Sequence, residues 1–133
     1  MTPPERSKPT VLVVDDERVI ADTLVAILRN EGFAATVTYS GSAAVENARE
    51  SSPDVLICDI VLEAVSGIEV AMRIRAMCQD CTIILMSGAQ ASAELLEQAS
   101  AEGHEFEVLA KPFHHTTLID KLRGGFDQTG EAA

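Results

Sequence analysis

The sequence has few aromatic and few basic residues. Only 4% of its 133 residues are aromatic and none is tryptophan, so a buried core has to be built from aliphatic side chains. Lysine and arginine number 10 against 21 aspartates and glutamates, which gives a formal net charge of −11. Because phosphate backbones and anionic membrane surfaces attract basic faces, this charge argues against nucleic acid and membrane as partners.

Long apolar runs and a disulfide framework are also absent from the sequence. The longest apolar runs, such as residues 55–58 and 82–86, are far shorter than the about 20 residues that cross a bilayer. The first ten residues are polar and contain three prolines, so we expect no signal peptide. Three cysteines are an odd number and do not indicate paired disulfides. We therefore expect a cytoplasmic protein with free thiols.

Short apolar segments alternate with segments of helical periodicity along most of the chain. The pattern predicts five strands, at residues 11–14, 34–39, 55–58, 82–86 and 106–109. It predicts five helices, at residues 19–31, 42–50, 67–77, 91–102 and 114–123. Strict alternation with short connections is typical of a single α/β domain, a doubly wound parallel sheet with helices on both faces.

Polar side chains follow four of the predicted strands. In chain order they are Asp15 and Asp16, Asp59, Ser87 and Lys111. Because ligands of such sheets bind at the carboxyl ends of the strands, we expect these side chains to meet at one edge. Three carboxylates about 5 Å apart repel by roughly 3 kcal/mol per pair at an effective dielectric constant near 20, so a cation is expected there. Oxygen ligands favour Mg²⁺, a hydroxyl and an ammonium can bind phosphoryl oxygens, and an aspartate can itself be phosphorylated. The set predicts phosphoryl chemistry on a carboxylate.

Four short motifs carry this set, and together they resemble the receiver domain of two-component response regulators from residue 11 to residue 122. The motifs are Val-Val-Asp15-Asp16-Glu17, Cys58-Asp59-Ile60 with Gly67 eight residues further on, Met86-Ser87-Gly88-Ala89 and Leu109-Ala110-Lys111-Pro112-Phe113. Each motif alone is weak, but four in this order, each at a strand end, are specific. The resemblance implies a flavodoxin-like (βα)5 fold with the strand order 2-1-3-4-5.

The resemblance also implies a role for each residue of the set. Asp59 would accept a phosphoryl group from a sensor histidine kinase or a phosphotransfer protein. Asp15, Asp16, Asp59 and the backbone carbonyl of Val61 would bind Mg²⁺, or Mn²⁺ in its place. The protein would not be an enzyme beyond catalysing its own phosphorylation and dephosphorylation.

Two further residues would bind the transferred group. Ser87 would donate a hydrogen bond to one phosphoryl oxygen and Lys111 would pair with another. The peptide bond between Lys111 and Pro112 would be cis. The phosphorylated domain would then signal through a changed partner-binding surface.

Two positions depart from the family pattern. Glu63 occupies a position where a proline is usual, and it is either a solvated loop residue or a residue that tunes metal affinity. Val108 occupies the position of the aromatic residue whose rotamer reports phosphorylation, and valine cannot make that movement. Phe106 is a candidate replacement on the switch and partner face, although a core or edge aromatic is the simpler interpretation.

The organisation of the chain follows from these assignments. We expect a disordered segment at residues 1–9, the receiver domain at 10–124 and a flexible tail at 125–133, with no output domain. Such a single-domain receiver would be a monomer or a weak dimer.

The alternative function is a phosphorylation-independent interaction module on the same fold. Such a module would need none of the acidic pair, Asp59, Ser87 and Lys111, so their presence argues against it. A dehalogenase-like phosphatase would need Asp-x-Asp after the first strand, whereas Asp15 and Asp16 are adjacent there. Nucleotide binding is not indicated either, because no phosphate-binding glycine motif follows that strand.

One motif lies outside this interpretation. Cys78 and Cys81 have the spacing of a metal or redox pair, but a single C-x-x-C is weak evidence. We expect structural or incidental thiols there.

Overall fold

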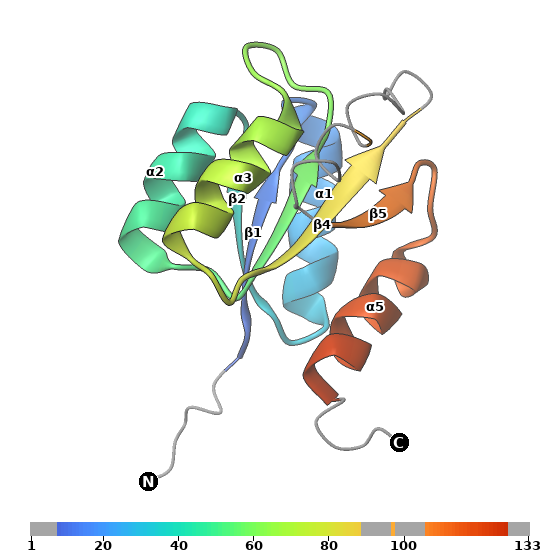
Figure 1. Cartoon of the computed structure of the whole chain (residues 1–133). Coiled ribbons are helices and arrows are strands. Elements are labelled where there is room, and N and C mark those ends of the chain that lie inside the picture. Colours follow the sequence, from blue (N-terminus) through green and yellow to red (C-terminus); the bar gives the residue numbers. More distant parts are fainter. Residues whose placement is uncertain (1–7, 89–96, 98–105, 128–133) are drawn as a thin grey trace, which may run out of the picture.

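Five parallel strands form one sheet in the computed structural model, which describes residues 8–88, 97 and 106–127 (Figure 1). The strands are β1 (Thr10–Val14), β2 (Ala34–Thr38), β3 (Val55–Asp59), β4 (Thr82–Ser87) and β5 (Glu107–Ala110). Their order in the sheet is β2-β1-β3-β4-β5. The predicted flavodoxin-like fold and strand order are therefore confirmed.

Helices cover both faces of the sheet. They are α1 (Arg18–Asn30), α2 (Gly41–Ser51), α3 (Gly67–Met77) and α5 (His115–Asp127). Helices α1 and α5 pack on one face, and α2 and α3 pack together on the other (Figure 1). The helix predicted at 91–102 lies outside the described residues except for Glu97, which is helical. No helix in the described ranges is long and apolar enough to span a bilayer.

Two aliphatic cores lie on opposite faces of the sheet, as the shortage of aromatic residues predicts. Every residue of β3 is buried, because helices cover this central strand on both sides. The core under α1 and α5 includes Leu24, Leu28, Leu118 and Leu122. The core under α2 and α3 includes Ala44, Ala48, Ile68, Ala71 and Ile74. Both cores fix the central strands, whose carboxyl ends carry the polar set.

Helix α5 is longer than the sequence predicts. We expected it to end at Arg123, because Gly124 and Gly125 are poor helix formers, but it continues to Asp127. Each glycine costs about 1 kcal/mol in a helix interior, which lowers stability without forcing the helix to stop. The buried face at Leu118 and Leu122 anchors the preceding turns.

Serine side chains fix the start of both helices on the α2 and α3 face. Ser40 Oγ accepts a hydrogen bond from the backbone N–H of Ala43, and Ser66 Oγ accepts one from that of Ile68. These caps satisfy N–H groups that the first helical turn leaves free. The cap at Ser66 also sets where the chain re-enters a helix after the loop that follows Asp59.

Candidate functional site

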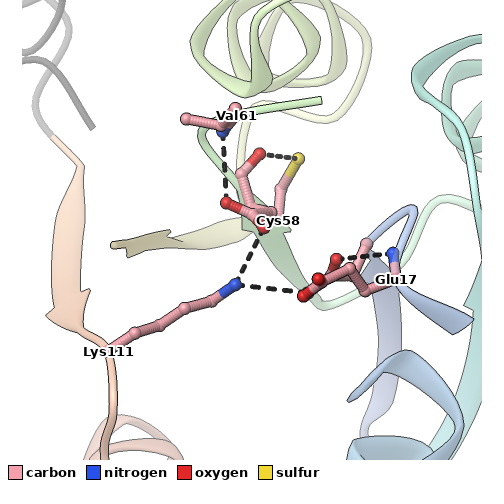
Figure 2. Close-up of polar contacts among 6 residues, drawn as sticks. Glu17, Cys58, Val61 and Lys111 are labelled. Carbon is pink, nitrogen blue, oxygen red and sulfur yellow. Dashed lines mark hydrogen bonds and ion pairs between the residues drawn. The ribbon is translucent and has the colours of Figure 1, made fainter. Parts of the chain in front are cut away.

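A single ammonium group connects two buried carboxylates at the carboxyl edge of the sheet. Lys111 Nζ lies 2.8 Å from Asp59 Oδ2 and 3.5 Å from Asp15 Oδ2. Figure 2 shows the lysine side chain reaching in from the chain after β5, between the segment of Val61 and that of Glu17. Asp15 is 0% exposed and Asp59 is 7% exposed. The edge thus holds two carboxylates and one ammonium in direct contact.

Backbone groups hold Asp15 in place. Its Oδ1 accepts a hydrogen bond of 3.0 Å from the backbone N–H of Glu17 (Figure 2). Its own backbone N–H donates to the carbonyl of Thr38 at 3.3 Å, and Thr38 Oγ1 donates to the carbonyl of Val13 at 3.1 Å. The end of β2 therefore supports the residue that ends β1.

Asp59 is held by the loop that follows it and by a close glycine. The backbone N–H of Val61 donates to Asp59 Oδ1 at 3.1 Å (Figure 2), and the N–H of Gly67 donates to the carbonyl of Ile60 at 2.7 Å. A Cβ atom at position 67 would clash with the Asp59 backbone carbonyl oxygen. Only glycine lets α3 begin so close to the backbone of Asp59.

The backbone after β5 directs Lys111 toward the carboxylates. Its N–H donates to the carbonyl of Ser87 at 2.8 Å, which joins the ends of β4 and β5. The Lys111–Pro112 peptide bond is cis, as the resemblance implied. Ser87 is half-buried at the same edge.

Burial and ion pairing shift the pKa values of Asp15 and Lys111. Burial raises the pKa of Asp15, and this outweighs the hydrogen bond from Glu17 and the charge of Lys111, which both lower it. Burial lowers the pKa of Lys111, but the hydrogen bond and charge of Asp59, with those of Asp15, leave it raised overall. Burial also raises the pKa of the neighbouring Cys58 thiol, so that thiol stays protonated.

A cavity of about 400 Å³ gives access to this edge, and among its lining residues are Asp59, Lys111, Gly88 and Glu63. A second cavity of about 460 Å³, between α2 and the loop before α3, shares Asp16 and Glu63 with the first. Glu63 is exposed, and Asp16 is half-buried. The extra carboxylate at position 63 thus lies on the rim of the site, where a proline was the family expectation.

The described part of the chain contains no group of three or more His, Cys, Asp or Glu side chains placed to hold a metal ion. The metal ligation expected of Asp15, Asp16 and Asp59 therefore stays a prediction. Lys111 lies between Asp15 and Asp59 and offsets part of their negative charge. Asp16 lines both cavities, the first of them together with Asp59 and Lys111. The oxygens of Asp15 and Asp59 and the nearby Val61 carbonyl are still hard donors of the kind that Mg²⁺ prefers.

The model of the response regulator receiver domain family matches residues 11–123. The chain belongs to this family. Among curated relatives, the probable transcriptional regulatory protein TcrX of Mycobacterium tuberculosis is 33% identical over 121 residues, which are 91% of this chain and 51% of that protein. The transcriptional regulatory protein CreB of Escherichia coli is 33% identical over 114 residues, 86% of this chain and 49% of that protein. The receiver domain thus spans about half the length of these relatives.

Solved structures give the same fold. The receiver domain of the Francisella response regulator 1452 is 26% identical with a TM-score of 0.77, and the match covers 92% of this chain and 99% of that one. A CheY-like receiver domain protein from Methanospirillum hungatei has a TM-score of 0.84 at 22% identity, covering 92% of this chain and 96% of that one, and shows the likeness in fold alone.

The two positions that the sequence predicts for the switch and partner face differ in burial. Val108 on β5 is 39% exposed, so it presents an aliphatic surface where the family usually has an aromatic ring. Phe106 lies just before β5, packs against the core under α2 and α3, and has the Arg75 guanidinium carbon 5.7 Å from its ring centroid. This packing agrees with the simpler interpretation of Phe106 as a core or edge aromatic, while its switch role stays a prediction.

Sequence reasoning missed the residues that orient the carboxylates. Thr38 is a buried polar residue at the end of a strand, and Glu17 contributes only its backbone N–H. The position of Thr38 at the end of a predicted edge strand is the one signal that could have identified it. Nothing in the sequence distinguishes Glu17, because any residue except proline supplies the same N–H.

Proposed function

We propose that this receiver domain accepts a phosphoryl group on Asp59 from the phosphohistidine of a sensor histidine kinase or of a phosphotransfer protein. The observation that carries the proposal is the contact of Asp59 with Lys111 beside the buried Asp15, at the mouth of a cavity. Family membership supports it independently, because the chain matches the receiver model over nearly its whole length.

The hydrogen bonds of the two Asp59 carboxylate oxygens bear on how the reaction would proceed. Asp59 Oδ1 is held by the Val61 N–H, so the carboxylate is fixed before the donor arrives. Oδ2 attacks phosphorus and the donor's imidazole nitrogen leaves with the electron pair of the broken P–N bond. Lys111 then bonds a phosphoryl oxygen, and the Ser87 hydroxyl donates to another. Both groups then stabilise the negative charge on the phosphoryl oxygens, which lie further from the protein backbone than the carboxylate oxygens do.

We further propose that Asp15, Asp16, Asp59 and the Val61 carbonyl bind Mg²⁺, with Mn²⁺ as a substitute. Their oxygens fit a hard divalent ion, and the burial that raises the pKa of Asp15 shows that this carboxylate lacks part of its solvation. When bound, the ion would neutralise phosphoryl oxygens during transfer. The protein catalyses only its own phosphorylation and dephosphorylation in this scheme.

The output of the domain is a changed surface for a partner protein. The relatives TcrX and CreB are named as transcriptional regulatory proteins, and the receiver domain matches about half of each. A net charge of −11 argues that the domain itself does not touch nucleic acid. A downstream protein therefore fits this chain better as its direct partner.

Intact mass measured after incubation with a small phosphodonor and Mg²⁺ tests the proposal. The wild-type chain should gain one phosphoryl group, and Asp59→Asn should gain none. Asp54→Asn is the matched control, because Asp54 lies next to the other end of β3, is exposed and contacts Thr10 instead of the site. A wild-type chain that gains no phosphoryl group, or an Asp59→Asn chain that gains one equally, would favour the phosphorylation-independent interaction module.

A further inference from the structure

Cys78 and Cys81 lie at the two ends of the turn between α3 and β4. The backbone N–H of Cys81 donates to the carbonyl of Cys78 at 3.1 Å, which closes a four-residue turn. In such a turn the first and fourth Cα atoms are less than about 7 Å apart, and disulfides usually span Cα separations of about 4.4–6.8 Å. The backbone therefore already holds the two cysteines within the range of a disulfide.

The two side chains also face the same part of the molecule. Cys81 is 5% exposed and belongs to the core under α2 and α3, and Cys78 is partly buried against that same core. Their sulfur atoms make only weak contacts, 3.9 Å from the carbonyl oxygen of Ala48 and 3.6 Å from that of Thr82. Either sulfur can therefore move away from its carbonyl contact without the loss of a strong hydrogen bond.

Their unequal exposure orders the reaction. Cys78 is open to solvent in part, so an oxidant can reach it. Burial, with a smaller contribution from the neighbouring Cys78, raises the pKa of Cys81 to about 12, so its thiol stays protonated at neutral pH. Cys78 is thus the first thiol to react, and Cys81 is the second.

We propose that Cys78 and Cys81 form a reversible intramolecular disulfide on exposure to a peroxide. The Cys78 thiolate attacks one peroxide oxygen, the O–O bond breaks, and a sulfenic acid and hydroxide form. The Cys81 sulfur then displaces hydroxide from the Cys78 sulfur, and its proton ends on water. In total the two thiols lose two electrons and two protons, and the peroxide takes up both to become two water molecules. A small dithiol reverses the oxidation by thiol–disulfide exchange.

This site is separate from the carboxyl edge of the sheet. The turn precedes β4, whose far end carries Ser87, so the disulfide would tie the end of α3 to the start of β4. The inference does not depend on phosphorylation of Asp59. It also leaves out Cys58, which is 0% exposed and has a raised pKa from burial.

Peptide mapping of the folded full chain after treatment with hydrogen peroxide tests the inference. Trypsin releases Cys78 and Cys81 together in residues 76–121 and Cys58 separately in residues 50–73, because it does not cut before Pro112. The wild-type chain should lose the mass of two hydrogen atoms, all of it in the 76–121 peptide, and should regain it with a dithiol. The peptide with Cys58 serves as the internal control and should keep its reduced mass.

Two variants make the test decisive. Cys78→Ser changes a partly exposed residue, and Cys81→Ala removes the buried thiol, so at least the first is expected to fold with a native circular dichroism spectrum. Both should reduce the two-hydrogen loss to background. The inference is overturned if the native wild-type chain keeps its thiols, if each cysteine gains oxygen without a bond to the other, or if the disulfide involves Cys58.

Discussion

Lys111 Nζ donates a 2.8 Å hydrogen bond to Asp59 Oδ2 and at the same time lies 3.5 Å from Asp15 Oδ2. One positive charge therefore offsets two buried negative charges that come from different strands. Removing it would leave both carboxylates desolvated and repelling each other, which costs more than the loss of an exposed ion pair. The stability of the domain thus depends on the same contact that we assign to phosphoryl transfer.

The first prediction is that Lys111→Met lowers the free energy of unfolding at pH 7 by about 1–3 kcal/mol, as measured by urea denaturation without divalent ions. The difference from wild type should shrink as the pH falls, because Asp15 has a raised pKa and takes up a proton early in the acid range. Lys121→Met is the control, since Lys121 pairs with Glu107 at 3.3 Å on the surface. It should change stability by less than about 0.5 kcal/mol. Equal losses in the two variants would contradict the assignment.

The second prediction concerns Asp15→Asn. Because the folded-state pKa of Asp15 is raised above 3.8, the folded protein favours its protonated form. That contribution to stability is fully present below the unfolded-state pKa and is lost as the pH rises through the folded-state pKa, so ionised Asp15 destabilises the fold at pH 7. Asparagine keeps an oxygen for the Glu17 N–H without the charge.

Thermal unfolding at pH 7 without divalent ions should therefore give a Tm a few degrees higher for Asp15→Asn than for wild type. Asp80→Asn, which removes the same charge from an exposed turn, corrects for the change in net charge. In Mg²⁺ titrations followed by NMR, Asp15→Asn should bind the ion more weakly. A lower Tm than wild type would show that ion pairing with Lys111 outweighs burial.

The third prediction compares two glycines. Gly67→Ala places a Cβ atom against the Asp59 carbonyl oxygen and should destabilise the domain by about 1–3 kcal/mol or more. Gly124→Ala meets no atom within 4 Å on α5 and should stabilise it by about 0.5–1 kcal/mol. Both are measured by chemical denaturation. Similar effects of the two changes would mean that helix propensity, and not contact with Asp59, determines the role of Gly67.

The sequence predicted the fold because its elements are locally consistent. The apolar run before Asp59 needs helices on both sides, and residues 67–77 have helical periodicity, so β3 and α3 were expected where they lie. Contacts between residues far apart in the chain could not be predicted from the sequence. Strand ends predicted that Asp15, Asp59 and Lys111 share an edge, but only packing decides that the ammonium contacts the Asp15 and Asp59 carboxylates while Asp16 lines the cavity beside them.

The fourth prediction tests the support that the sequence did not reveal. Thr38 Oγ1 donates to the Val13 carbonyl at 3.1 Å, and the Thr38 carbonyl accepts the backbone N–H of Asp15. Thr38→Val keeps the shape but removes the donor, so the free energy of unfolding should fall by about 0.5–1.5 kcal/mol. Thr36→Val, an exposed change on the same strand, should be nearly neutral.

Amide chemical shifts then separate loss of stability from loss of position. If Thr38 holds the end of β1, the amide resonances of Val14 and Asp15 should move in Thr38→Val and stay in place in Thr36→Val. Mg²⁺ affinity should fall in the first variant only, because the end of β1 that carries Asp15 then loses the hydrogen bond from Thr38 Oγ1 to the Val13 carbonyl. Unchanged Asp15 resonances in a destabilised Thr38→Val protein would reduce Thr38 to a packing residue of the edge strand.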